Sequence, residues 1–129
     1  MAETTTAPPF APLQKHSYAN LFTYRRSGEA VKTPVWFALH DGKAYVMTTA
    51  NAGKVKRIRN NNRVLIGPSD QRGTPLGPTI EGVARILPPE EVAVAREALD
   101  RKYGLLKAVF DFFLTVRGTE RAWIEIAPR

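Results

Sequence analysis

The residues best suited to chemistry lie between Thr48 and Arg57, where the sequence reads TTANAGKVKR. Two threonine hydroxyls come first, small residues follow, and Lys54 and Arg57 stand three positions apart, a spacing that places them on one face of a helix. Backbone N–H groups at a helix start bind anions, helped by the helix dipole, and Gly53 lets a ligand approach the backbone closely. Together these features predict a binding site for one phosphate group.

Basic residues are concentrated around the same segment. The chain has 19 Lys and Arg against 12 Asp and Glu, which gives a net charge of +7. A basic cluster without any acid lies in residues 54–63 and consists of Lys54, Lys56, Arg57, Arg59 and Arg63. Local positive charge attracts phosphates, polycarboxylates or nucleic acid. The alternative interpretation, a solvated helix face, is equally compatible with this pattern.

Composition and motifs exclude several kinds of catalytic site. The chain has no cysteine, so thiolate metal sites and cysteine nucleophiles are absent, and two histidines, His16 and His40, are too few to predict a metal centre. No serine lies in a G-x-S-x-G turn, and there is neither a P-loop nor a G-x-G-x-x-G motif. Glu81 and Glu125 are interpreted as surface charges. No catalytic residue is assigned.

The chain has no feature typical of a membrane or secreted protein. No apolar run approaches the roughly 20 residues that span a bilayer. The N-terminal residues contain an early acid and three prolines, and they lack the apolar core of a signal peptide. We therefore expect a cytoplasmic protein without a membrane span.

The elements that must position the phosphate site begin with strands. A chain of 129 residues is one domain, with residues 1–15 expected to form a flexible tail and residues 16–129 the domain. Turn sequences at residues 27–29 and 40–43 separate three β-rich runs, which predicts an antiparallel meander. Pro34 cannot donate a hydrogen bond to a neighbouring strand, so it is expected at a bulge or an edge.

The remaining segments complete a barrel with helices. Asn51 is expected to cap a short helix that ends at residues 60–62, and Gly104 is expected to end a longer helix that begins at the prolines of residues 88–89. Further strands are predicted at residues 63–67, 79–87 and 121–127, and an apolar helix, buried against the barrel or another subunit, at residues 105–116. The predicted fold class is mainly β (α+β), a six-stranded antiparallel barrel with flanking helices.

The order of several motifs resembles the flavin and deazaflavin split-barrel family, in particular its pyridoxamine-phosphate-oxidase-like, deazaflavin (coenzyme F-420)-dependent branch. The motifs are TPVWFA at residues 33–38, Thr48 with Thr49, GKVKRIR at residues 53–59 and PSDQRG at residues 68–73. The resemblance covers residues 17–127. It implies a six-stranded split barrel that forms a homodimer with two cofactor sites at the interface.

The resemblance also implies where the cofactor lies. The ring is expected against the second strand, near Pro34, Val35 and Trp36, mostly through backbone contacts. The ribityl phosphate is expected at the segment that the residues themselves indicate, with contributions from Thr48, Thr49, Lys54 and Arg57. Lys56 and Arg59 are expected to attract the acidic tail of a deazaflavin. Trp36 is interpreted with equal weight as a core aromatic or a ring contact.

This chain departs from the family pattern at three positions. Ala52 stands where relatives commonly have Ser, and Ser69 and Gln71 stand where Cys and Arg are frequent. The backbone N–H of Ala52 is expected to keep contacting the phosphate, so the lost hydroxyl costs about 1 kcal/mol.

The function that the resemblance implies is an oxidoreductase that transfers a hydride between reduced coenzyme F-420 and an unsaturated or conjugated small organic substrate, with FMN as the second candidate cofactor. Two alternatives remain open. One is a non-catalytic split barrel that binds FMN, haem or another planar ligand. The other is a nucleic-acid-binding module, which is disfavoured because the basic residues are confined to one short helix.

Overall fold

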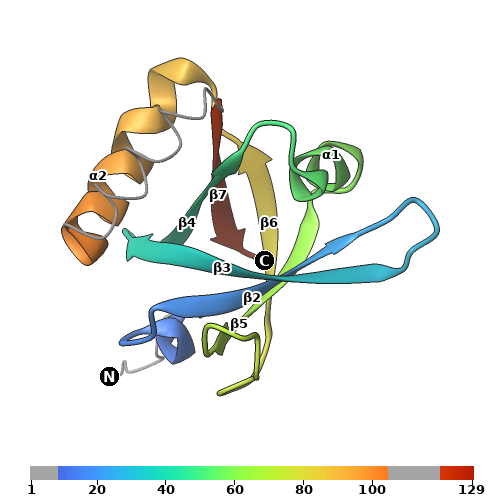
Figure 1. The fold of residues 1–129 in the computed structure, drawn as a ribbon, viewed down its shortest axis with the longest axis horizontal. Helices are drawn as coiled ribbons and strands as arrows, with labels where there is room; N and C mark the ends of the chain where they lie inside the picture. Colours follow the sequence, from blue (N-terminus) through green and yellow to red (C-terminus); the bar gives the residue numbers. More distant parts are fainter. Residues whose placement is uncertain (1–8, 105–119) are drawn as a thin grey trace, which may run out of the picture.

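The computed structural model describes residues 9–104 and 120–129, and within them six antiparallel strands close into a barrel in the order β2-β3-β4-β7-β6-β5 (Figure 1). The strands are β2 (Tyr18–Tyr24), β3 (Ala30–His40), β4 (Lys43–Thr49), β5 (Arg63–Ser69), β6 (Ile80–Ile86) and β7 (Arg121–Pro128). The helices are α1 (Gly53–Asn60) and α2 (Val92–Tyr103), with the 3-10 turns η1 (Ala11–Leu13) and η2 (Pro89–Glu91). The predicted six-stranded antiparallel barrel is confirmed, and the apolar segment 105–116 lies outside the described residues.

The turns of the meander follow from their sequences. Asp41 and Gly42 connect β3 to β4 with φ angles of 52° and 77°, and His40 pairs with Lys43 on either side. Two positive φ angles in a two-residue hairpin define a type I′ turn, which Asp-Gly favours because its twist matches that of the strands. This turn fixes the register of β3 on β4 and therefore decides which residues face the barrel interior.

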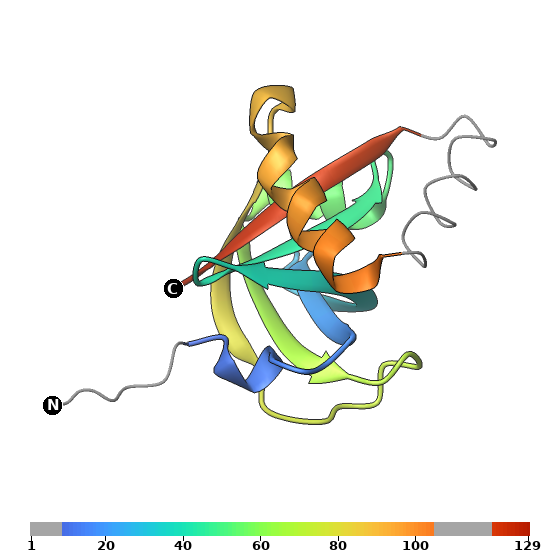
Figure 2. The same ribbon diagram turned by 90° about the vertical axis from the view of Figure 1, so that its left-hand side faces the viewer.

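The barrel interior holds alternate side chains from every strand. Phe37 opposes Val46, Val46 opposes Ile124, and Leu21 lies between β3 and β5 opposite Ile66, all of them fully buried. Phe10, which caps η1, and Leu13 at the end of η1 add two buried side chains to this core, and η1 packs at one end of the barrel (Figure 2). The folded part therefore starts before the boundary that we expected at residue 16.

Helix α2 covers the outside of β3, β4 and β7 (Figure 2). It buries Leu99 and Ala95 against Ala38 and Trp123, in a second apolar cluster separate from the barrel interior. Gly104 follows the last turn with a φ of 53°, as its predicted role at the helix end requires. No helix in the described part of the chain is long and apolar enough to cross a membrane.

Glu125 is buried, so its interpretation as a surface charge is wrong. It is 7% exposed, and its carboxylate accepts hydrogen bonds from the Tyr45 hydroxyl at 3.1 Å and from Arg85 Nε at 2.9 Å. Lys43 Nζ lies 3.9 Å away. The outer face of β7 is covered, which alternation along one strand does not reveal. Burial and the hydrogen bond to Glu125 raise the pKa of Tyr45 to about 12.

The raised pKa of Tyr45 predicts a loss of stability at alkaline pH. The fold favours the neutral phenol, so this contribution is complete below pH 10 and declines as the pH rises towards about 12. We expect the free energy of unfolding of the wild-type protein to fall more steeply than that of Tyr45→Phe, by up to about 1.4 kcal/mol per pH unit. Urea unfolding at pH 9, 10 and 11 measures the two slopes, and parallel curves would contradict the assignment.

Candidate functional site

The candidate site lies where β3 separates from β4. The two strands pair from His40 with Lys43 as far as Phe37 with Val46, and the next residues, 34–36 of β3 and 47–49 of β4, form no pairs with one another. Over the same residues β3 still pairs with β2, and β4 still pairs with β7. Pro34 therefore lies on a free strand edge. This position was predicted, because proline has no N–H to donate to a neighbouring strand.

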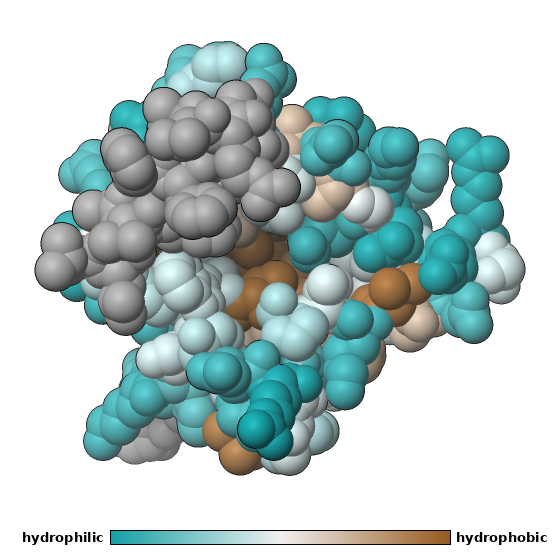
Figure 3. Space-filling model, in the orientation of Figure 1, coloured by the Kyte–Doolittle hydropathy of each residue, from teal (hydrophilic) through white to brown (hydrophobic). Residues whose placement is uncertain are grey.

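A cavity of about 290 Å³ occupies this split between the two strands. Its lining residues come from both strands and from the loops and helices around them: Tyr18, Pro34, Val35, Trp36, Met47, Thr48, Thr49, Lys54, Gln71 and Leu99. Figure 3 shows apolar residues at the bottom of a hollow near the centre of the same face. The cavity thus combines an apolar wall with polar groups from β4 and α1.

Aromatic rings form one wall of the cavity. Trp36 is half-buried and stacks on Tyr103 of α2, with ring centroids 5.1 Å apart and planes at 16°, and Tyr18 meets Trp36 edge-on at 6.3 Å. The Tyr103 hydroxyl accepts a hydrogen bond from the Phe37 N–H at 2.9 Å and lies 2.7 Å from the Ser17 carbonyl oxygen. Tyr103 therefore holds Trp36 in place from the outside. Trp36 thus packs on Tyr103 and also lines the cavity, and its contact with a cofactor ring stays a prediction.

Lys54 supplies the positive charge of the cavity. It stands in the first turn of α1, and its Nζ donates to Thr48 Oγ1 at 3.3 Å. No carboxylate among the described residues forms an ion pair with it. Burial lowers its pKa, and the charge of Arg57 lowers it further. A partly buried ammonium without a counter-ion favours an anionic ligand at this end of the cavity.

Arg57 does not line the cavity. Its Nε donates to Thr23 Oγ1 at 2.6 Å, and its Nη1 lies 2.8 Å from the position that a Cβ on Gly53 would occupy. The missing side chain of Gly53 therefore makes room for Arg57 and not directly for a ligand. Burial and the charge of Arg25 lower the pKa of Arg57. Its guanidinium lies against the first turn of α1 and adds positive charge there.

The start of α1 differs from the prediction in two ways. The N-cap is Ala52, without a side-chain hydrogen bond, so the expected cap at Asn51 is wrong. The Ala52 N–H already donates to the Thr49 carbonyl at 3.1 Å, so it is not free to contact a phosphate. The Val55 N–H donates to the Ala52 carbonyl at 3.1 Å, so the N–H groups of Gly53 and Lys54 are the ones that remain at the start of the helix for an anion.

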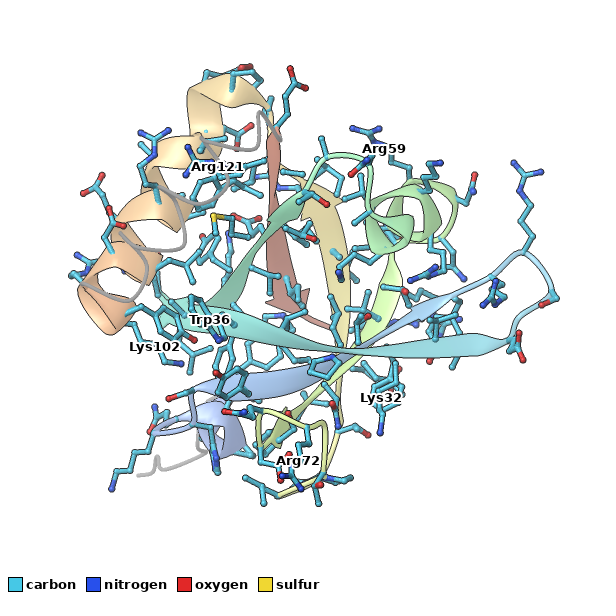
Figure 4. All side chains as sticks on the ribbon, viewed as in Figure 1. Lys32, Trp36, Arg59, Arg72, Lys102 and Arg121 are labelled. Carbon is cyan, nitrogen blue, oxygen red and sulfur yellow. The ribbon has the colours of Figure 1, made fainter. Side chains whose placement is uncertain are left out.

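Gln71 reaches the cavity from a loop that is fixed to the barrel. Asp70 accepts hydrogen bonds from the N–H groups of Arg72 and Thr74 at 2.8 and 2.9 Å, which closes the loop. The Gly73 carbonyl then accepts hydrogen bonds from Asn20 Nδ2 at 2.8 Å and Lys32 Nζ at 3.3 Å. Figure 4 shows Lys32 and Arg72 on the same side of β3, below the strand in this view. The loop consequently holds Gln71 at the cavity without help from a ligand.

Six of the nine predicted site residues line the cavity: Pro34, Val35, Trp36, Thr48, Thr49 and Lys54. The other three, Ala52, Lys56 and Arg57, do not, and the exposed Lys56 lies on the outside of α1. Sequence reasoning missed Met47 and Leu99. The place of Met47 at the cavity could have been predicted from the sequence, because Met47 directly precedes the two threonines on β4. The place of Leu99 could not, because Leu99 reaches the cavity only through the packing of α2.

No metal centre is indicated by the described residues, which contain no group of three or more His, Asp or Glu side chains arranged to hold an ion. Neither histidine of the chain lines the cavity. A ligand in this site would therefore be held by the aromatic wall, the strand edge and Lys54.

No protein-family model and no curated protein matches this chain. Several solved structures match it in fold. A heme binding protein from Mycobacterium smegmatis aligns with a TM-score of 0.71 at 16% identity, covering 100% of this chain and 53% of that one. A conserved hypothetical protein from Mycobacterium tuberculosis aligns with a TM-score of 0.66 at 24% identity, covering 89% and 74%.

An F-420 reductase aligns with a TM-score of 0.63 at 20% identity, covering 97% of this chain and 96% of that one. At these identities the likeness concerns the fold, and proteins that carry different ligands share it. The chain therefore has the split-barrel fold.

Proposed function

We propose that this chain binds a planar cofactor with a phosphate-bearing side chain, a deazaflavin (coenzyme F-420) in preference to FMN, and acts as an oxidoreductase on a small unsaturated or conjugated substrate. The observation that carries the proposal is the position of the Lys54 ammonium. This residue places a positive charge, without an acidic partner among the described residues, at one end of a cavity whose lining is otherwise mostly apolar and aromatic.

The residues of the cavity fit the two halves of such a cofactor. Val35 and Trp36 offer a flat apolar edge to a ring system, and the strand edge at Pro34 leaves room beside it. Lys54 and the hydroxyls of Thr48 and Thr49 offer hydrogen-bond donors to a phosphate. An aromatic wall next to a cation is what a ring joined to a phosphate requires.

A bound deazaflavin or flavin would supply the hydride chemistry. The residues of this chain would orient the ring and keep water from one of its faces, with Tyr103 holding Trp36 against it. No side chain needs to act as a nucleophile. Tyr18 lines the cavity and is a hydroxyl-bearing residue beside the proposed ring site, so it is the candidate for positioning a substrate or a proton.

Haem is less well supported than a deazaflavin. The chain has no cysteine, and neither of its histidines lines the cavity, so iron would lack these two common axial ligands. Lys56 and the exposed Arg59 favour a deazaflavin over FMN, because they lie on the helix that follows the phosphate site and can attract an acidic tail.

Equilibrium titrations with coenzyme F-420, FMN and haem, followed by fluorescence or absorbance, test the choice of cofactor. We expect coenzyme F-420 to bind with a micromolar or lower Kd and FMN more weakly. Tight binding of haem alone would replace the proposal with a haem-binding function. Failure of all three ligands would contradict a cofactor site.

Lys54→Ala tests the phosphate assignment. We expect the variant to lose roughly 1.5–3 kcal/mol of binding free energy for both coenzyme F-420 and FMN, the range for a hydrogen bond to a charged group. Arg26→Ala is the control, because it removes one positive charge from the exposed hairpin turn between β2 and β3, away from the cavity. Calorimetry measures the affinities, and an unchanged affinity in Lys54→Ala would remove the assignment.

Lys56→Ala separates the tail from the phosphate. We expect it to weaken binding of coenzyme F-420, whose tail is acidic, and to have little effect on FMN, which has no tail. The difference should shrink as salt is raised, because an exposed charge is screened. Equal effects on both ligands would show that Lys56 does not recognise a tail.

We also propose that two copies of the chain complete the site as a homodimer. The cavity of about 290 Å³ is at the lower limit for ligand pockets, roughly 300 Å³, so one copy can enclose only part of a tricyclic cofactor. Light scattering at micromolar concentration should give the mass of a dimer. A monomer, with and without saturating cofactor, would contradict this proposal.

A further inference from the structure

A second hollow lies outside the proposed cofactor site, between η1, β3 and α2. Its volume is about 310 Å³, and it shares no lining residue with the cavity between β3 and β4. Its apolar lining comes from Leu13, Ala38, Leu39 and Ala98, and three cationic side chains, Lys15, Arg101 and Lys102, also line it. Basic groups from two separate elements thus converge on one apolar groove.

These three cations are not neutralised by acids of the described residues. Elsewhere on the barrel, surface arginines form ion pairs, such as Arg85 with Glu91 at 2.6 Å and Arg25 with Glu29 at 3.0 Å. Around the groove the pattern differs. Arg101 Nη2 lies 3.4 Å from His40 Nδ1, so the nearest described partner of this guanidinium is another basic residue.

The Lys102 ammonium contacts an aromatic ring and not a carboxylate of the described residues. Its Nζ is 3.6 Å from the ring centroid of Phe37 and 5.4 Å from that of Tyr103 (Figure 4 labels it beside Trp36). Contact with a ring face supports a cation without cancelling its charge. Partial desolvation lowers the pKa of Lys102 to about 8, and a bound anion would reverse that effect.

The backbone at the edge of the groove is held in a rare conformation. Lys15 has a φ of 71°, in the left-handed region that side chains other than glycine seldom adopt. Non-glycine residues in that region cost free energy and gather at functional sites. The conformation follows the end of η1, where the His16 N–H donates to the Leu13 carbonyl at 3.3 Å, and it leaves Lys15 lining the groove.

We propose that this groove is a second ligand site that takes a small organic dianion, a phosphate monoester with a compact apolar body. Three cations select a doubly charged headgroup, and the apolar lining favours a hydrocarbon portion over a free inorganic ion. The site is independent of the proposed cofactor cavity, and its occupation does not require that cofactor.

Phenyl phosphate and inorganic phosphate are suitable probes for the wild-type protein. In a ¹H–¹⁵N NMR titration at about 0.15 M salt, where exposed charges are largely screened, we expect phenyl phosphate to shift the amide signals of Lys15, Leu39 and Ala98 in a saturable way. Inorganic phosphate should shift the same signals at least about five-fold more weakly, because it lacks the apolar body. Equal binding of the two probes would overturn the assignment of a monoester.

Charge-removing variants locate the site. Lys102→Met keeps most of the side-chain volume over Phe37, and Arg101→Gln keeps a polar group, so both retain the packing of α2. Each should lower the affinity for phenyl phosphate at least about five-fold, and Arg26→Ala, which removes the same charge from a distant hairpin turn, should leave it within two-fold.

Three results would overturn the proposal. Affinities that are equal in all variants would show that the groove cations do not bind the phosphate. A loss of affinity in Lys54→Ala but not in Lys102→Met would place the probe in the cavity between β3 and β4. Shifts that spread over all basic surfaces and do not saturate would show nonspecific attraction by net charge.

Discussion

The separation of β3 from β4 beyond the pair Phe37–Val46 is the constraint on which the site depends. A closed barrel satisfies its backbone hydrogen bonds by pairing every strand on both sides, and here one strand gives up that pairing on one side. Pro34 reduces the cost, because it has no N–H to leave unpaired. The open edge becomes a cavity because Met47 and the two threonines of β4 remain paired with β7 and so stay in place.

Aromatic packing keeps this opening from closing. Tyr103 joins the C-terminal end of α2 to β3 through its ring, stacked on Trp36, and through its hydroxyl, hydrogen-bonded to Phe37. Lys54, which forms no ion pair with any carboxylate of the described residues, adds an electrostatic reason for an anion to enter, since partial burial of such an ammonium costs free energy that a bound phosphate would return. A ligand that binds only the folded chain would therefore also raise its thermal stability.

Local sequence signals predicted the fold well, because they concern neighbours in the chain. Asp41-Gly42 predicts its hairpin from its own backbone preferences, and Gly104 predicts the end of α2. The errors arise where distant segments meet. Burial of Glu125 depends on Tyr45 and Arg85, both remote in sequence, and Phe10 joins the core from a segment whose composition is typical of a flexible tail.

The same distinction applies to the site. Six of the predicted residues line the cavity: Thr48, Thr49 and Lys54 come from one strand-to-helix segment, whose own residues indicate an anion site, and residues 34–36 of β3 are those that the family resemblance implies. Arg57 was misplaced because helical spacing alone does not show that Thr23, on β2, binds its guanidinium. A crystal structure of the protein with coenzyme F-420 tests the proposed cofactor site most directly. We predict the ring against residues 34–36 and the phosphate within hydrogen-bond distance of Lys54. A ring bound elsewhere, or a phosphate away from Lys54, would contradict a cofactor site between β3 and β4.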